Sequence, residues 1–222
     1  MLRRFLTPAV YQALVPLLLL AGWGRTDWRE FFIHPARSGL IAVVILSGGV
    51  VLLLRLDLHP LRRGTSPAGH QTFLLVTLAL PSLCWIWFLP FADRRQILTF
   101  TGKQPLRYLG LGLCIAGIVV RLLALAKLGD YFSAYVTLQD EHQLVQSGIY
   151  GTIRHPLYLS LLLAGPGFAL VFASLLVWPI LVVTAGFVFT RIRQEDQLLE
   201  SRFGGEFREY RRRVGALLPR MG

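Results

Sequence analysis

Long apolar runs separated by short polar connections form the main pattern of this chain. Four of the runs have about the 20 residues that an α-helix needs to cross a bilayer; they are residues 5–23, 38–54, 71–91 and 106–128. A fifth run, residues 157–190, is too long for one span and contains a Gly-Pro-Gly sequence. We interpret it as a hairpin of two short helices that turns near Ala173 and Ser174. Proline is tolerated in such helices when their neighbours satisfy the freed backbone groups.

This pattern predicts an all-α fold: a polytopic, multi-pass integral membrane protein with five to six transmembrane helices and a C-terminal helical hairpin. The count depends partly on residues 5–23, where two arginines precede an apolar core and small residues follow. Such a segment is either a first span or a cleaved signal peptide. We favour the span, because the rest of the chain is equally apolar.

Composition supports a membrane protein. The chain is 54% hydrophobic and only 16% charged, whereas soluble domains carry about 25% charged residues. The formal net charge of +11 comes from basic residues between the apolar runs, where they can face anionic headgroups. No basic stripe interleaved with aromatic residues occurs on a soluble segment, so we expect no nucleic-acid partner.

The basic residues also orient the chain. Lys and Arg are more numerous on the side that holds the 129–156 loop and the C-terminal tail. Because basic loops remain in the cytoplasm, we expect this loop and the C-terminus on the cytoplasmic side.

Two polar segments, 129–160 and 187–214, flank the predicted hairpin. Since a hairpin returns the chain to the side from which it started, the two segments should meet. We therefore expect Arg191 and Glu195 of the second segment to contact side chains of the first. These are His142, Tyr150, His155 and Tyr158.

The second polar segment has a helical pattern. Arg191 and Glu195 are one turn apart and share a face. Gly204 and Gly205 should end this helix, and an apolar stripe then continues on an amphipathic stretch through Phe207, Tyr210 and Val214. The alternative is an interfacial helix on which Arg191 and Glu195 form an ordinary surface pair.

Three of the five histidines precede a proline, which biases them towards helix boundaries. His34 and His59 lie in basic connections, and we interpret both as helix boundaries only. His155 opens the first helix of the hairpin and lies among the candidate site residues.

Arg121 lies inside the apolar run 106–128. An ionisable group at that depth faces a cavity or a partner, or else extends towards the membrane surface. Cys84 and Cys114 lie in apolar runs, where we expect both to be buried. The chain has no Cys/His cluster with metal-ligand spacing, so we expect no metal.

One combination of motifs resembles a known family. The sequence HQLVQSGIYGTIRHPLY, followed by R-x-x-x-E and FGGEFREYRRRV, resembles the isoprenylcysteine carboxyl methyltransferase family. The resemblance covers roughly residues 129–214, and the first half matches only in being membrane spans. It implies an integral membrane enzyme that uses S-adenosylmethionine. Related patterns occur in phospholipid N-methyltransferases and in NADPH-dependent membrane sterol reductases.

The resemblance also implies roles for individual residues. Arg191 matches the catalytic residue assigned to the substrate carboxylate, and Tyr135 departs from a glutamine that contacts the cofactor in animal members. As an alternative, Tyr150 and Tyr158 belong to an interfacial aromatic belt. The residues implied in cofactor binding are His142, Gln143, Leu144, Val145, Tyr150, His155, Pro156, Leu157, Tyr158 and Glu195.

The chemistry of methyl transfer is compatible with these residues. A carboxylate acceptor is already ionised at neutral pH and needs positioning rather than a base, and the guanidinium of Arg191 binds carboxylates bidentately. Glu195 suits the ribose hydroxyls or the ammonium of the cofactor, and tyrosines can face its sulfonium. An amine acceptor needs a base, and His155 or Glu195 could serve. The sequence therefore leaves open a prenylcysteine or a phospholipid acceptor.

We expect two functional parts. Residues 1–128 form the N-terminal transmembrane helices that bind the lipid-modified substrate. Residues 129–222 form the catalytic part, with a cytoplasmic cofactor pocket between the hairpin ends. A phospholipid N-methyltransferase, an NADPH-dependent sterol-type reductase and a non-enzymatic membrane scaffold are the alternatives. The pattern does not specify an oligomeric state.

Overall fold

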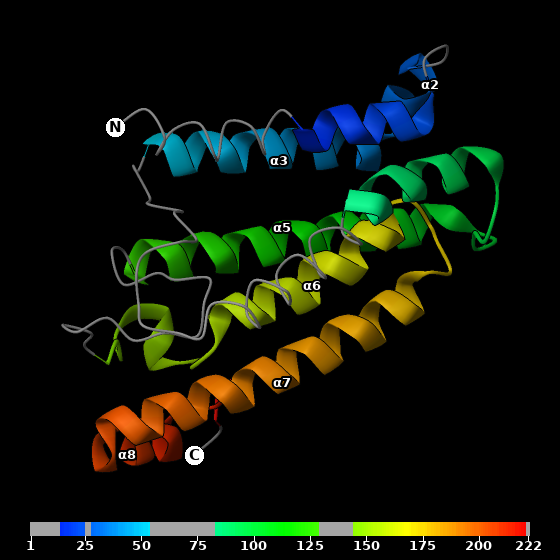
Figure 1. The fold of residues 1–222 in the computed structure, drawn as a ribbon. Coiled ribbons are helices and arrows are strands. Elements are labelled where there is room, and N and C mark those ends of the chain that lie inside the picture. Colours follow the sequence, from blue (N-terminus) through cyan, green and yellow to red (C-terminus); the bar gives the residue numbers. More distant parts are fainter. Residues whose placement is uncertain (1–13, 25–27, 54–82, 129–143, 221–222) are drawn as a thin grey trace.

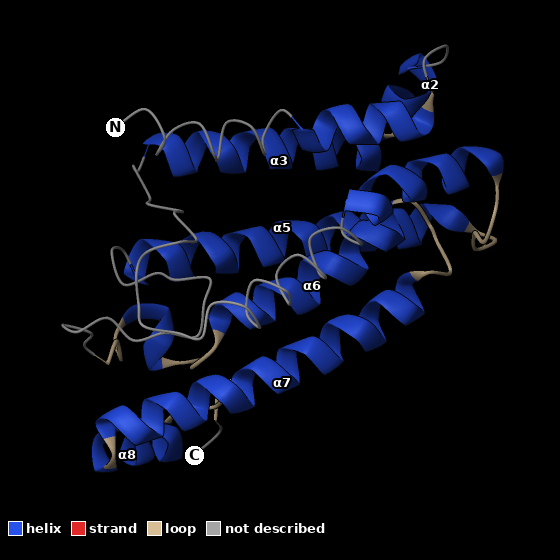
Figure 2. Ribbon diagram, in the orientation of Figure 1, coloured by secondary structure: helices blue, strands red, loops and turns tan. Residues whose placement is uncertain are grey.

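The computed structural model describes residues 14–24, 28–53, 83–128 and 144–220. Most of these residues are helical, and the only pairing of extended backbone among them consists of two isolated bridges (Figure 2). The all-α prediction is therefore confirmed for the described part of the chain. The axes of helices α3, α5, α6 and α7 are roughly aligned, with α6 and α7 antiparallel. Helix α8 lies at the C-terminal end of α7 (Figure 1).

The N-terminal half begins with a described helical segment, Leu14–Trp23. Helix α2 (Trp28–Ile33) and helix α3 (Pro35–Leu53) follow, and another helical stretch covers residues 83–95. The predicted boundary at His34 is confirmed: its carbonyl accepts the N–H groups of Arg37 at 3.0 Å and Ser38 at 3.2 Å. Proline at the first helical position has no N–H to leave unsatisfied. The corresponding prediction for His59 lies outside the described residues.

The described residues of the C-terminal half form four α-helices: α5 (Lys103–Leu128), α6 (Pro156–Val171), α7 (Val177–Phe203) and α8 (Gly205–Arg213). A short 3₁₀ helix, η2 (Gly148–Gly151), precedes α6. As predicted, the helix after Arg191 stops at Gly204, which has a φ of 52° in the region that glycine adopts without strain.

The hairpin turns where the apolar pattern predicted. Helix α6 ends at Val171 and α7 begins at Val177, and Ala173 adopts a φ of 47° in the connection. Backbone bonds to the loop before α5 hold this turn: Phe100 donates to the carbonyl of Ala173 at 2.9 Å, and Leu175 donates to that of Leu98 at 2.7 Å. Since buried backbone groups need partners, this loop fixes the point where the hairpin reverses.

Helices α5 and α6 pack closely because glycines lie at their contact. A Cβ atom on Gly110 would lie 2.5 Å from the backbone nitrogen of Val171, and one on Gly167 would lie 2.9 Å from the carbonyl oxygen of Gly110. Small residues allow such close approach of helix backbones. This packing fixes α6, and with it the position of the residues at its N-terminus.

A buried ionic network joins four elements near the hairpin turn. Arg107 on α5 bonds Asp93 at 2.5 and 2.7 Å and donates to the carbonyl of Val171 at 2.8 Å. Arg37 on α3 lies 3.7 Å from Asp93, and its guanidinium carbon is 4.2 Å from the ring centroid of Trp23. The sequence pattern did not reveal this network, because its charges lie on three helical segments that are far apart in the sequence.

Two described helices, α3 and α5, are long and apolar enough to cross a membrane; Leu14–Trp23 and α6 are shorter apolar helices. The predicted spans 5–23 and 71–91 lie partly outside the described residues. Arg121 is exposed on α5. Cys114 is buried as expected, whereas the expectation for Cys84 is wrong because it is exposed.

Candidate functional site

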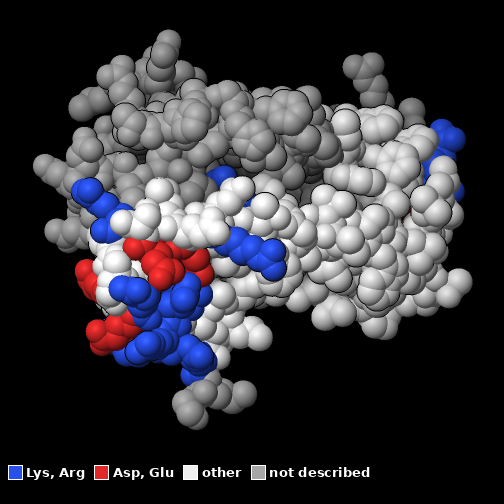
Figure 3. All heavy atoms as spheres, turned by 60° about the horizontal axis from the view of Figure 1, so that its bottom comes forward, with Lys and Arg blue, Asp and Glu red and all other residues white. Residues whose placement is uncertain are grey.

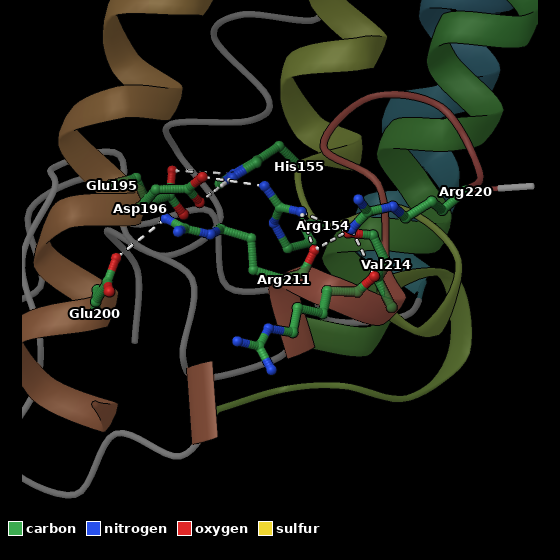
Figure 4. Close-up of polar contacts among 9 residues, drawn as sticks. Arg154, His155, Glu195, Asp196, Glu200, Arg211, Val214 and Arg220 are labelled. Atoms are coloured by element: carbon green, nitrogen blue, oxygen red, sulfur yellow. Dashed lines mark hydrogen bonds and ion pairs between the residues drawn. The ribbon is translucent and has the colours of Figure 1, made fainter. Parts of the chain in front are cut away.

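The two ends of the hairpin meet at His155. Its Nε2 atom lies 2.8 Å from Oδ1 of Asp196, and its Nδ1 atom lies 3.7 Å from Oε2 of Glu195. These residues come from the start of α6 and the polar end of α7 (Figure 4). The predicted meeting of the two polar segments is therefore confirmed at this residue.

The local sequence positions His155 through the backbone. His155 is the N-cap residue of α6 and Pro156 occupies the first turn, as the His-Pro sequence predicted. The His155 carbonyl accepts the N–H groups of Tyr158 and Leu159, each at 3.1 Å. The imidazole is only 4% exposed, and its centroid lies 5.7 Å from that of the Tyr158 ring.

His155 is charged at neutral pH. Burial by itself lowers the pKa of the imidazole, but the hydrogen bonds to Asp196 and Glu195 outweigh this effect and raise it to about 9. Both ring nitrogens carry a proton in the imidazolium form: Nε2 donates to Asp196, and Nδ1 faces the Glu195 carboxylate at ion-pair distance.

Asp196 is fully engaged within the protein. Its Oδ1 faces His155, and its Oδ2 accepts a 3.1 Å bond from the Arg154 guanidinium. Burial would raise the pKa of this carboxyl, but the hydrogen bond and charge of His155, with the charge of Arg154, hold it below its ordinary value. Neither Asp196 nor Arg154 was among the predicted site residues, although each is the immediate neighbour of one.

The C-terminal tail closes one side of this cluster. The N–H groups of Arg154 and His155 each donate, at 2.9 Å, to the carbonyls of Gly215 and Ala216. The Arg154 side chain also donates to the Val214 carbonyl at 2.5 Å. The tail therefore satisfies backbone donors that the start of α6 leaves open.

Helix α8 is held by the apolar stripe that the sequence predicted. Phe207, Tyr210 and Val214 are buried, and their cluster includes Leu144, Leu199 and Phe203. The Tyr210 hydroxyl donates to the Tyr150 carbonyl at 2.6 Å. The protein itself therefore covers this face, in contrast to the interfacial-helix alternative.

Arg191 and Glu195 share a face of α7 with Tyr158 opposite them. Arg191 is only 8% exposed, so it does not form the ordinary surface pair that we considered. The Tyr158 side chain interacts with both the Arg191 guanidinium and the Glu195 carboxylate. The predicted neighbours Tyr158, Arg191, Glu195 and His155 therefore form one cluster.

The other predicted residues lie around this cluster or outside the described chain. Tyr150 and Pro156 are buried, and Leu157, Leu144 and Val145 are half-buried. Leu144 packs on the α8 cluster, a contact that its sequence context did not suggest. His142, Gln143 and Tyr135 lie outside the described residues. Within the described ranges, no group of His, Cys, Asp or Glu side chains is placed to hold a metal ion.

Residues 110–201 match the model of the isoprenylcysteine carboxyl methyltransferase family. The resemblance inferred from the HQLV, RHPLY and R-x-x-x-E motifs is thereby confirmed. The matched stretch holds α6, His155 and the polar end of α7, which are the elements that build the cluster.

Two curated relatives each match about half of the chain. A protein-S-isoprenylcysteine O-methyltransferase of Saccharomyces cerevisiae is 35% identical over 114 residues, which cover 50% of this chain and 48% of that protein. The cobalt-zinc-cadmium resistance protein CzcN of Cupriavidus metallidurans is 38% identical over 101 residues, 45% of this chain and 46% of that protein. This chain thus spans about half the length of these relatives.

A solved structure resembles the whole fold. The eukaryotic intramembrane Ras methyltransferase, isoprenylcysteine carboxyl methyltransferase, has a TM-score of 0.59 and 21% sequence identity to this chain. The match covers 96% of this chain and 75% of the other. The family motifs lie in the C-terminal half only, but the described helices of the N-terminal half also share the fold of this solved structure.

Proposed function

We propose that this protein is a membrane-embedded methyltransferase that transfers a methyl group from S-adenosylmethionine to a lipid-modified acceptor. The proposed acceptor group is the α-carboxylate of an isoprenylcysteine-like molecule. The observation that carries this proposal is the cluster of Arg191, Tyr158, Glu195 and His155 within the stretch that matches the methyltransferase family.

Glu195 fits a role in holding S-adenosylmethionine. Its side chain is 36% exposed, whereas that of Asp196 is 16% exposed and uses both oxygens within the protein. A carboxylate has about four lone-pair sites, so Glu195 retains acceptor capacity for ribose hydroxyls or an ammonium group. Tyr158 and Tyr150 supply aromatic surface nearby, which suits an adenine ring or a cation.

Arg191 fits the binding of a carboxylate acceptor. When bound, S-adenosylmethionine supplies an electrophilic methyl group on a sulfonium. Arg191 offers a planar guanidinium within reach of Tyr158. A buried ion pair between a guanidinium and the carboxylate of the acceptor fixes both the position and the orientation of that carboxylate. We propose that Arg191 holds the acceptor and that the buried surroundings exclude water.

The state of His155 favours a carboxylate over an amine acceptor. An amine must lose a proton before it attacks the methyl group, but His155 is charged at neutral pH and both its nitrogens face carboxylates. The charge and hydrogen bond of His155 also hold the pKa of Glu195 below its ordinary value, although burial opposes this. Neither group is therefore a good base, and a carboxylate acceptor needs none.

The fold suggests where each substrate approaches. We propose that residues 129–222 hold the cofactor at the cytoplasmic end of the hairpin. We further propose that residues 1–128 supply the membrane helices against which the lipid tail of the acceptor lies. The protein would then be a multi-pass membrane protein with its C-terminus in the cytoplasm.

A methyl-transfer assay on detergent-purified protein tests the proposal. Labelled S-adenosylmethionine is offered with a prenylcysteine or with an amine-headed phospholipid. We expect a base-labile methyl ester on the prenylcysteine and no transfer to the amine. Failure to bind S-adenosylhomocysteine, or transfer to the phospholipid alone, would overturn it.

The variant Arg191→Ala tests the role of the guanidinium. We expect turnover to fall at least about 100-fold, because a buried charged hydrogen-bond partner is worth about 1.5–3 kcal/mol and positioning adds to this. Calorimetry should show S-adenosylhomocysteine affinity close to that of the parent protein. Arg193→Ala, which alters an exposed arginine two positions away, is the matched control. Equal turnover in both variants would remove Arg191 from the mechanism.

A further inference from the structure

A basic pocket lies beside the candidate site, between the end of α8 and the C-terminal tail. Its volume is about 530 Å³, within the range of about 300–1,000 Å³ that is usual for ligand sites. Basic residues crowd this end of the molecule (Figure 3). Among the residues that the structure describes, five arginines and no acidic residue line the pocket; this lining comprises Arg154, Arg208, Arg211, Arg212, Val214, Gly215, Ala216, Leu218, Pro219 and Arg220.

The walls of this arginine pocket are fixed by hydrogen bonds. Arg220 donates to the carbonyls of Arg211 at 3.1 Å and Arg212 at 2.6 Å, which ties the tail to the last turn of α8. Arg154 donates to the Val214 carbonyl (Figure 4), and a bridge joins Ile153 to Gly215. The pocket is therefore formed by the fold, and these bonds satisfy carbonyls that would otherwise weaken its positive potential.

The positive charge of the pocket is only partly balanced. Arg211 pairs with Glu200 at 3.1 Å, and Arg154 pairs with Asp196. Arg208 and Arg212 are exposed, and their guanidinium groups take part in none of the hydrogen bonds or ion pairs found among the described residues. The Nε atom of Arg154, whose side chain is 8% exposed, is buried and also lacks a hydrogen-bond partner in the described structure.

This arrangement suits an anion with several oxygen atoms. Guanidinium groups form bidentate bonds to phosphate, and several of them around one cavity recognise a phosphoryl group better than a single halide or carboxylate. Leu218, which is 72% exposed, also lines the pocket. An apolar side chain next to clustered arginines is typical of proteins that contact anionic lipids at the membrane surface.

We propose that the arginine pocket binds a phosphate group, and that Leu218 favours the headgroup of an anionic phospholipid as its source. Arg208 and Arg212 bind the phosphate oxygens, and Leu218 lies against the adjoining apolar part of the lipid. This proposal is independent of the methyltransferase proposal, because it concerns another cavity and needs no methyl donor.

The test uses the full chain in a neutral detergent and three probes: a short-chain phosphatidic acid, the matching phosphatidylcholine and inorganic phosphate. Binding is measured by calorimetry. We expect the phosphatidic acid to bind. The double variant Arg208→Gln/Arg212→Gln should weaken that binding at least about tenfold, since two charge-assisted bonds are lost. Arg193→Gln, on the exposed face of α7, should leave it unchanged.

Leu218→Ser separates the two phosphate sources. If the headgroup is the ligand, this variant weakens binding of the phosphatidic acid but not of inorganic phosphate. If inorganic phosphate binds as tightly as the lipid and Leu218→Ser affects neither, the pocket is a phosphate site without a preference for lipid.

Two outcomes would overturn the proposal: no probe binds, or the phosphatidylcholine binds as tightly as the phosphatidic acid. Equal binding to the double variant and to Arg193→Gln would overturn it as well. Since Arg208 and Arg212 are exposed, the double variant should melt at the same temperature as the parent protein in the absence of any probe, which excludes misfolding as the cause.

Discussion

At His155 the backbone and the side chain make separate contacts. The backbone starts α6, and the tail carbonyl of Ala216 accepts its N–H. The ring faces Asp196 and Glu195 across the hairpin. The same residue therefore marks a helix boundary and joins the two halves of the candidate site.

The His155–Asp196 pair predicts a dependence of stability on pH. The folded pKa of His155, about 9, exceeds its ordinary value of 6.5, so its contribution is complete below pH 6.5 and is lost as the pH rises towards 9. The folded pKa of Asp196 is lowered, so its contribution is complete above its ordinary value of 3.8 and is lost in more acidic solution.

The measurement is the thermal midpoint of the parent protein and of His155→Gln between pH 5 and pH 9.5. We expect the difference between the two to be largest near pH 5–6 and to shrink as the pH approaches 9. A difference that stays constant over this range would show that the charge of His155 does not contribute.

The adjacent acids should separate into two roles. Asp196→Asn removes the charge that holds Arg154 and His155, so we expect stability to fall by about 1–3 kcal/mol. Glu195→Gln alters the more exposed carboxylate, so we expect a smaller loss of stability but at least about tenfold weaker S-adenosylhomocysteine binding. Denaturation and calorimetry measure the two effects. The reverse assignment of effects would contradict the roles we propose.

At the scale of the elements, glycine decides how closely α5 and α6 approach. The close contact of Gly110 with backbone atoms of α6 leaves no flexible side chain that could move aside. Since α6 carries His155 at its N-terminus, a shift of this helix would also move the candidate site.

Gly110→Ala should therefore destabilise the protein, and Gly112→Ala is its matched control. A Cβ atom at Gly110 meets backbone atoms 2.5 and 2.6 Å away, whereas nothing lies within 4 Å of one at Gly112. We expect a loss of about 1–3 kcal/mol for the first and no loss, or a small gain, for the second, because alanine favours helix. Thermal midpoints in detergent measure both. Equal midpoints would show that the helices can separate without cost.

At the scale of the whole molecule, polar networks hold both ends of the hairpin. The Arg37–Asp93–Arg107 network lies near the turn, and the His155–Asp196–Arg154 cluster lies at the open end. A cluster of buried apolar residues, among them Phe31, Leu40 and Phe172, packs around the turn. We infer that the first network serves stability alone, whereas the second stabilises the open end and also positions the residues of the proposed chemistry.

Asp93→Asn tests this division. It leaves two buried arginines without their anion, and breaking a buried ion pair costs about 3–5 kcal/mol. We expect a large fall in the thermal midpoint but unchanged S-adenosylhomocysteine affinity at low temperature, because the turn lies at the other end of the hairpin. Glu209→Gln, which removes an exposed pair with Arg213 at 3.9 Å, should change the midpoint little. Loss of cofactor affinity in Asp93→Asn would contradict the division.

The sequence by itself determined the features that depend on local pattern. Apolar runs and turn residues gave the helices, the hairpin with its turn near Ala173, the break at Gly204 and the apolar stripe of α8, because helix periodicity and backbone preference act between near neighbours. The hairpin predicted the meeting of the two polar segments at the open end, and the short motifs around His155 and Arg191 carried the family resemblance.

Only the tertiary structure decided which charges pair and where the tail lies. Asp196 and Arg154 are adjacent to predicted residues, but nothing local shows that one would bind the other, 42 positions away. Nothing local shows that Asp93 would pair with Arg37 and Arg107 either, or that the carbonyls of the C-terminal tail would accept the N–H groups at the start of α6. Such contacts join residues that are far apart in sequence, so their partners are specified by how the helices pack and not by the residues around each charge.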